Sequence, residues 1–323
     1  MVRFSAFLVS LLFAGAAFAQ AYPNRPVRVV VPWPPGQATD IAARIIAARL
    51  QEQLGQPFVI ENKPGAGGAI GTDLVAKSPG DGYTLLAASS GPISIMPNLQ
   101  KTPYDPLKDL APVSVTCTNS FALVTRPDFP ATNAREFVAL LRANPDKYAF
   151  SSSGTGATAH LIAELFNSMA KVKARHVPYK GSAPALTDVM NGQIDYTIET
   201  VAAVQANVRA GRMKLLGLTF AKGSPAFPEA PSLDKAADIP GYDIGAWIGY
   251  AASPGTPKEI TNRLAAEIAK AVQVPEVRER MLGLGLEPTS MTPDEMAVFM
   301  RKEQQRYGDI IRTANIKIEE GNK

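Results

Sequence analysis

The sequence predicts an α/β fold of two lobes, each a mixed sheet flanked by helices. The chain has 323 residues, a length that accommodates roughly two domains. Hydrophobic residues make up 46% of it and charged residues 19%, a globular composition that excludes a disordered chain. Short apolar runs typical of buried strands alternate with segments of helical periodicity. That order favours sheets with helices on their faces and loops at their strand ends.

The first 19 residues have the pattern of a secretory signal peptide. Arg3 provides a short positive start, an apolar run covers residues 4–18, and 17–19 reads Ala-Phe-Ala, a small-x-small cleavage pattern. The run is too short for a transmembrane helix, and no later segment reaches the roughly eighteen apolar residues that a membrane span needs. We therefore predict cleavage after Ala19 and a soluble mature chain that begins at Gln20.

The mature chain is expected to open with two strand–loop–helix units and a third strand. These strands are predicted at residues 27–31, 58–60 and 83–87. Thr39 or Asp40 is expected to cap the first helix, and the glycine loop 64–68 leads into a second helix that ends near Lys77. The third strand ends in the sequence Ser-Ser-Gly at 89–91.

The middle of the chain repeats this architecture. Strands are predicted at residues 113–117, 148–150, 176–179, 194–198 and 214–218, with helices at 157–169 and 184–190. The last eighty residues add a strand at 247–251, an amphipathic helix around 260–272 and a helical tail. We expect crossings between the lobes near 121–124 and 245–250. Lobe 1 would then comprise residues 20–122 and 246–323, and lobe 2 residues 123–245.

The charge of the chain gives no sign of a nucleic-acid partner. Lys and Arg total 33 against 29 acidic residues, and this net charge of +4 is spread along the chain. Nucleic-acid-binding proteins gather their basic residues, so no nucleic-acid partner is expected.

Cys117 is the single cysteine, which leaves no internal disulfide and no lipid-attachment cysteine in the signal region. Its strand-like surroundings predict a buried structural thiol, and an exported protein of this kind fits a bacterial periplasm.

Enzyme and cofactor motifs are absent. The sequence has no Gly-x-Ser-x-Gly elbow and no His-Glu-x-x-His motif, and His160 and His176 are its two histidines. The segment 65–71 superficially matches a dinucleotide loop, but Asp81 opens the next strand instead of ending it. We therefore expect no catalysis, metal or cofactor, and a structural hydrogen-bonding role for His160.

Three loops share a chemistry that suits a polar ligand. The loops 35–39, 89–91 and 152–156 are small, uncharged and rich in backbone N–H and hydroxyl donors. Two of them precede helices, whose free amides and dipole favour an anion such as a carboxylate. Sugars and amides are alternative ligands, and ordinary capping is the alternative role. Glu199 either meets a ligand's ammonium, hydroxyl or water or lies on the surface, while Trp33 either walls the site or only packs.

Several stretches together resemble one family. The sequence Val-Pro-Trp-Pro-Pro-Gly at 31–36, followed by Asp40, resembles its first ligand loop. Its other signatures resemble residues 62–68, Gly71, 81–86, 152–154, 160–161, 164–166, 176–181, 184–185, Asp188 and 192–195. These stretches are similar to the Bug/TctC extracytoplasmic solute receptors, the binding proteins of tripartite tricarboxylate transporters. The match runs in order over essentially the whole mature chain.

The resemblance implies a two-lobed periplasmic binding protein of type II-like fold, with a hinge between the lobes, that closes over a small carboxylate. It implies a monomer that delivers its ligand to inner-membrane transporter subunits. Carried over by position, the lobe 1 contacts would be Trp33, Gly36, Gln37, Ala38, Thr39, Ser89 and Ser90. The lobe 2 contacts would be Ser153, Thr155, Gly156, Ala157 and Glu199.

Three positions depart from the family pattern. Gln37 stands where a second glycine is common, Ala157 where a hydroxyl residue is frequent, and Glu199 where Asp is usual. These changes leave the fold untouched and bear on ligand identity. Dicarboxylates, tricarboxylates, aromatic acids and amino acids all remain compatible, although the lack of an arginine clamp disfavours highly charged tricarboxylates.

Two other functions are compatible with this fold. The closed receptor could signal to a membrane sensor instead of a transporter. A hydrolase or lyase on the same scaffold would use Glu199 or His160 as its base, but it lacks a nucleophile, a metal cluster and a second acid.

Overall fold

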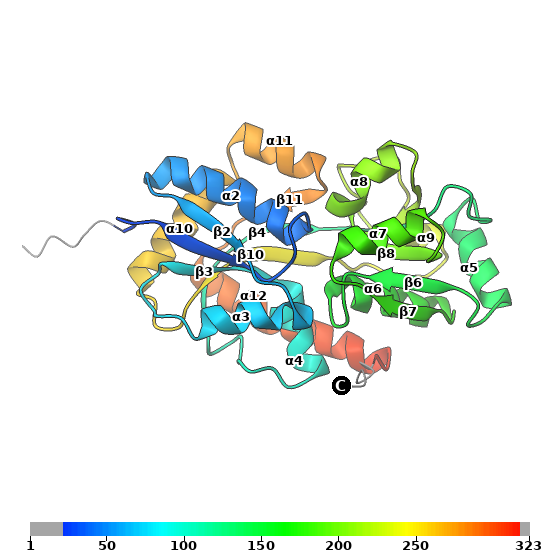
Figure 1. The fold of residues 1–323 in the computed structure, drawn as a ribbon, viewed down its shortest axis with the longest axis horizontal. Coiled ribbons are helices and arrows are strands. Elements are labelled where there is room, and N and C mark those ends of the chain that lie inside the picture. The colour runs from blue at the N-terminus through cyan, green and yellow to red at the C-terminus, as the bar shows by residue number, and fades with distance from the viewer. Residues whose placement is uncertain (1–21, 317–323) are drawn as a thin grey trace, which may run out of the picture.

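Two sheets lie along the long axis of the molecule, and the chain passes from the first to the second and back (Figure 1). The computed structural model describes residues 22–316. The predicted signal peptide, its cleavage site and Gln20 lie outside the described residues. Each sheet contains parallel and antiparallel pairs and carries helices. The predicted α/β class with two mixed sheets flanked by helices is therefore confirmed.

The first sheet has six strands within the described chain. Across the sheet they are β11 (Leu286–Pro288), β4 (Ala111–Asn119), β10 (Ala246–Ala252), β3 (Thr84–Ser89), β1 (Val27–Val31) and β2 (Phe58–Asn62). Strand β1 pairs in parallel with β2 and β3, whereas β10 runs antiparallel to β3 and β4. Its helices are α2 (Ala38–Leu54), α3 (Ala69–Ala76), α4 (Met96–Leu99), α10 (Lys258–Ala271), α11 (Pro275–Gly283) and α12 (Pro293–Thr313), with the short turns η1 (Ala66–Gly68) and η2 (Gly91–Ile95).

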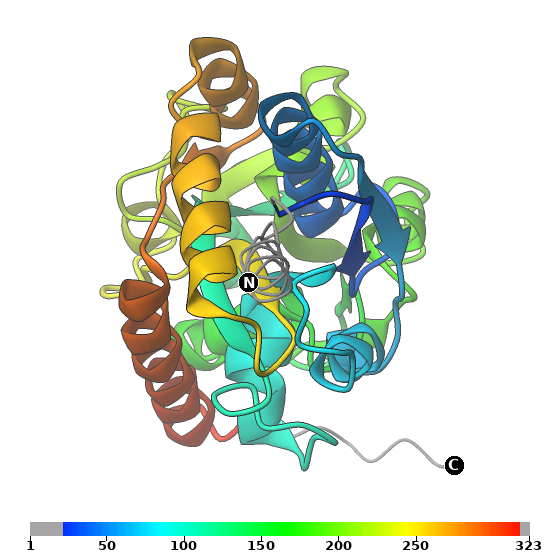
Figure 2. The same ribbon diagram turned by 90° about the vertical axis from the view of Figure 1, so that its left-hand side faces the viewer.

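Both faces of this sheet are buried, which explains why β1 is a continuous valine-rich run. Val27, Val29 and Val31 contribute to a core that α2, α10 and α11 close. Val30 contributes to a second core, closed by α3 and α12. Figure 2 shows these two groups of helices on opposite sides of the sheet.

The second sheet has five strands in the described chain. Their order is β7 (Arg175–Pro178), β6 (Ala149–Ser152), β8 (Tyr196–Thr200), β5 (Phe121–Thr125) and β9 (Lys214–Leu218). The helices of this part are α5 (Ala134–Ala143), α6 (Thr158–Ala170), α7 (Ser182–Met190), α8 (Val201–Arg209) and α9 (Leu233–Ala236). Side chains of α5 and α6 contribute to the core on one face, and those of α7 and α8 to the core on the other.

The two passages of the chain between the sheets lie side by side. The first is Ser120, which lies between the end of β4 and the start of β5. The stretch 121–124, near which a crossing was expected, belongs to β5 of the second sheet. The second passage includes Gly245, where a Cβ atom would lie 2.7 Å from the carbonyl oxygen of Asn119. Close approach of two backbones therefore requires glycine here. The division into lobes at residues 122 and 246 stays a prediction.

Helix α12 packs on both sheets. Met296 and Met300 lie in a core of the first sheet, whereas Tyr307 and Ile311 belong to a core of the second. The Tyr307 hydroxyl also donates to the carbonyl oxygen of Gly245, 2.5 Å away, at the second passage. The C-terminal helix therefore returns to the first sheet, as predicted, and also contacts the second.

The start of α2 differs from the prediction. Gln37 is the N-cap residue, so the prediction that Thr39 or Asp40 caps this helix is wrong. Asp40 lies in the first turn instead, where its Oδ2 accepts from the Gly36 N–H at 2.9 Å and its Oδ1 from Asn62 Nδ2 at 2.8 Å. The Asp40 carboxylate therefore holds the loop that precedes α2 through hydrogen bonds made from the first turn of the helix. Helix α7 likewise begins at Ser182, two residues before the predicted position.

Two further expectations concern Cys117 and the membrane. Cys117 is a free, fully buried thiol, and burial raises its pKa to about 12, which confirms the structural role. Among residues 22–316, no helix combines the length and apolar character of a membrane span.

Candidate ligand-binding site

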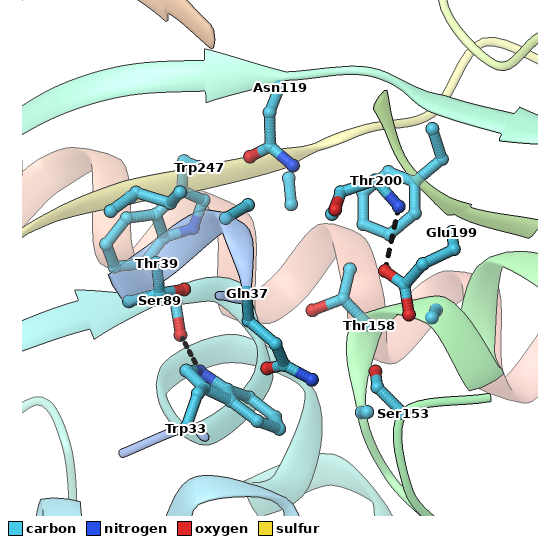
Figure 3. A pocket seen from close by; sticks show the side chains of 16 residues that line it. Trp33, Gln37, Thr39, Ser89, Asn119, Ser153, Thr158, Glu199, Thr200 and Trp247 are labelled. Atoms are coloured by element: carbon cyan, nitrogen blue, oxygen red, sulfur yellow. Dashed lines mark hydrogen bonds between the residues drawn. The ribbon is translucent and has the colours of Figure 1, made fainter. Parts of the chain in front are cut away.

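A cavity of about 40 Å³ lies between the two sheets, and side chains from both line it (Figure 3). Trp33 follows β1, Ser89 ends β3, Ser153 follows β6, and Glu199 lies in β8. Strands β1 and β3, like β6 and β8, are parallel, so their carboxyl ends meet at one edge of each sheet. Ligand sites of α/β proteins form at such edges.

Most of the residues predicted to contact a ligand line this cavity. They are Trp33, Gln37, Ala38, Thr39, Ser89, Ser153, Ala157 and Glu199. Thr155 lines a neighbouring cavity of about 420 Å³, which shares Trp33 and Ser153 with the first. Gly36 lines a third cavity, beside Ser182.

The remaining two predicted residues, Ser90 and Gly156, form hydrogen bonds that hold the protein together beside the site. The Ser90 hydroxyl accepts from the Trp247 backbone N–H at 2.9 Å, which joins the end of β3 to β10. The Gly156 N–H donates to His160 Nδ1 at 3.2 Å, which fastens the second-sheet loop to α6.

Half of the residues that line the cavity were not predicted from the sequence. The missed residues are Asn119, Phe121, Thr158, Ala159, Thr200, Ala246, Trp247 and Ile248. Thr158 and Ala159 directly continue the 152–157 loop, and that adjacency is the one signal that pointed to them. The others lie in or beside the passages between the sheets, where only strand pairing brings them to the site.

Two helix N-termini, one from each part of the molecule, open onto the cavity. The first helical hydrogen bonds of α2 and α6 run from Ile41 N to Gln37 O and from Leu161 N to Ala157 O. The backbone N–H groups of the preceding residues are therefore free of the helical pattern. Ala38 and Thr39 of α2, and Thr158 and Ala159 of α6, line the cavity. Such paired termini stabilise an anion without a cationic side chain.

Trp33 both packs and walls the site. Its indole Nε1–H donates to Ser89 Oγ at 2.9 Å, and the side chain is buried. A Cβ atom on Gly91 would lie 2.9 Å from Trp33 Cζ2, so glycine allows the ring to lie against η2. Asn62 Nδ2 donates to the Trp33 carbonyl oxygen, at 2.9 Å. The ring is therefore fixed in position before any ligand arrives.

Glu199 is buried at the opposite wall, with 3% of its surface exposed, so the surface-exposed alternative is wrong. Its Oε1 accepts from the Thr200 backbone N–H at 2.7 Å and its Oε2 from Ser182 Oγ at 2.9 Å. Burial raises the pKa of Glu199 above its ordinary value, and hydrogen bonds from Thr200, Ser182 and Ser153 oppose that shift.

Several polar atoms of the lining residues are left without a protein partner. Within the described chain, Gln37 Nε2, Asn119 Oδ1 and Trp247 Nε1 are buried and make no hydrogen bond. Buried polar groups almost always have partners, so these atoms are available to hydrogen-bond water or another polar molecule in the cavity. The lining residues of the described chain include no Lys, Arg or His, and Glu199 is their one charged side chain.

Two α/β units with a polar cavity between them are the architecture of periplasmic binding proteins. Three solved structures have the same fold, with TM-scores of 0.86–0.89, and one of them is the periplasmic binding protein BugD. The family model for the tripartite tricarboxylate transporter family receptor matches residues 42–316. The chain belongs to this family, as its sequence resemblance predicted.

Individual relatives agree with this assignment. Protein BugT of Bordetella pertussis is 36% identical over 317 residues, which cover 97% of this chain and 96% of BugT. A protein of R. palustris solved with adipate has a TM-score of 0.88 at 34% identity, and the match covers 92% of this chain and 99% of that one. MatC of Rhodopseudomonas palustris, solved with malate, has a TM-score of 0.82 at 32% identity and coverages of 90% and 100%.

Proposed function

We propose that this protein is a periplasmic receptor that captures a small organic carboxylate between its two lobes and delivers it to a tripartite tricarboxylate-type membrane transporter. The observation that carries the proposal is the pair of helix N-termini, from α2 and α6, that line one cavity with uncharged donors. Two family members of similar structure, solved with adipate and with malate, support a carboxylate ligand.

Binding proceeds by closure of the lobes about a hinge. Residues of both sheets line the cavity of about 40 Å³, and in this scheme the sheets separate to admit a ligand. A ligand that touches both lobes then stabilises the closed arrangement alone. The passages at Ser120 and Gly245 form the hinge of this scheme. One lobe comprises residues 20–122 and 246–323, and the other comprises residues 123–245.

The receptor acts as a monomer without a cofactor, and it performs no covalent chemistry. The ligand contacts are the twelve residues carried over from the family pattern, with Trp33, Gln37, Thr39 and Ser89 on one lobe and Ser153 and Glu199 on the other. Delivery to transporter subunits follows from the family's place in tripartite transport.

A binding panel on the mature chain from Gln20 tests this function. Dicarboxylates, tricarboxylates, aromatic acids and amino acids are compared with sugars by thermal shift, and the hits by calorimetry. A ligand at about 100 times its Kd stabilises the folded state by roughly 2.7 kcal/mol, so one acid class should raise the Tm clearly. Stabilisation by sugars and by no carboxylate would overturn the proposal. Small-angle scattering with the best acid should then show a smaller radius of gyration.

A further inference from the structure

The charge inside the cavity is opposite to the one that a carboxylate receptor would be expected to carry. Neutral donors at the N-termini of α2 and α6 suit one ligand carboxylate. The charged side chain of the lining, Glu199, is itself an acid. A second carboxylate of the ligand, placed near Glu199, would meet like charge in a buried site. Burial makes that repulsion stronger than it is in water.

No cation of the described chain compensates Glu199. Its hydrogen-bond partners, on Thr200, Ser182 and Ser153, are all neutral, and none of the ion pairs found within residues 22–316 includes it. A buried carboxylate with no counter-charge is costly, unless a bound molecule supplies that charge.

A second acceptor lies in the same lining. Asn119 Oδ1 has no hydrogen-bond partner in the described chain, and the residue is 2% exposed. Figure 3 shows this oxygen turned toward Trp247, whereas Glu199 lies across the cavity from Trp33 and Ser89. The site therefore has hydrogen-bond donors at the helix N-termini, an unpartnered acceptor at Asn119 and, at Glu199, a buried acid without a counter-charge.

We propose that the ligand is an amino-substituted carboxylate, whose ammonium group donates to Glu199 while its carboxylate binds the N-termini of α2 and α6. This inference rests on the proposed function and narrows its ligand class. An ammonium supplies hydrogen-bond donors and one positive charge, which match the acceptor oxygens and the negative charge of Glu199. Unsubstituted dicarboxylates match the donor side alone.

Matched ligand pairs test the inference by calorimetry. The pairs are aspartate and succinate, glutamate and glutarate, and 4-aminobutanoate and butanoate, in which one ammonium is the difference. In at least one pair, the amino member should bind tenfold tighter or more. In the near-isosteric variant Glu199→Gln the preference should fall to about one, and Glu199→Asp, which keeps the charge, should retain most of it. Circular dichroism and the Tm establish that each variant is folded.

The outcomes separate this inference from the function beneath it. Equal or tighter binding of the unsubstituted acid in every pair, or an unchanged preference in Glu199→Gln, would overturn the ammonium assignment and leave a carboxylate receptor. Failure of every carboxylate in the wider panel to bind would overturn the proposed function itself.

Discussion

The imidazole rings of His160 and His176 stack with their centroids 4.0 Å apart and their planes 13° from parallel. Phe150 covers the other face of His176, at a centroid distance of 4.9 Å. Each histidine also holds the 152–156 loop: Ser152 Oγ lies 2.7 Å from His176 Nε2, and the Gly156 N–H donates to His160 Nδ1. These contacts confirm the structural, hydrogen-bonding role predicted for His160, and they link this residue to the loop at the wall of the cavity.

The first prediction concerns acid stability. Burial, and then the neighbouring His160, lower the pKa of His176 from 6.5 to about 3. Between these values the unfolded chain binds a proton that the folded chain does not, so acidification favours unfolding by up to roughly 1.4 kcal/mol per pH unit. Urea unfolding at pH 6.5 and pH 5 should show a smaller loss of stability in His176→Gln than in the wild type. Equal losses in the two proteins would contradict the assignment.

The second prediction concerns Glu199 in the ligand-free protein. Because its folded-state pKa lies above 4.5, the stability that protonated Glu199 contributes is complete below pH 4.5 and is lost as the pH rises through the folded pKa. Glu199→Gln does not titrate, so its stability relative to the wild type should increase from pH 4.5 to pH 8. The increase is limited to roughly 1.4 kcal/mol per pH unit. A constant difference across this range, measured by urea unfolding, would show that Glu199 does not change its ionisation there.

The third prediction concerns the second-sheet loop. Ser153 lines the cavity and is one of the proposed ligand contacts, so Ser153→Ala should weaken binding of the carboxylate that the panel identifies. Loss of one hydrogen bond to a charged group costs about 1.5–3 kcal/mol, which corresponds to a roughly ten- to hundredfold higher Kd. Thr155→Ala should also weaken binding, although Thr155 lines the neighbouring cavity. Unchanged affinity in both variants, measured by calorimetry, would remove these residues from the site.

The fourth prediction concerns the passage between the sheets. In Gly245→Ala the new Cβ atom would lie 2.7 Å from the Asn119 carbonyl oxygen and 2.2 Å from Phe220 Cε1. Such overpacking costs about 1–3 kcal/mol, and we expect a lower free energy of unfolding by this amount. Gly283, the last residue of α11, is the matched control, because a Cβ there meets nothing within 4 Å. Gly283→Ala should be neutral or stabilising by up to about 1 kcal/mol. Equal effects of the two substitutions would contradict the role of Gly245.

Local patterns predicted the elements well, and long-range contacts explain the differences. The strand 214–218 has the predicted bounds, because a short apolar run between turns carries its own signal. The start of α2 was misplaced because Asp40, a good capping residue in isolation, bonds Gly36, Arg44 and Asn62 instead. Asn62 is 22 residues away in the sequence, beyond the reach of a local pattern.

The sequence by itself determined the α/β class, the family and the loops 35–39, 89–91 and 152–156, because helical and strand periodicity, glycine turns and uncharged donors are all written within short stretches of chain. Only the tertiary structure decided which side chains share the cavity. Asn119, Thr200 and Trp247 reach it through pairing of strands distant in sequence, and Glu199 becomes a buried charge only when the second sheet closes around it. The burial of Glu199 and its lack of a counter-charge arise only in the folded protein, and these two properties narrow the class of ligand that we propose.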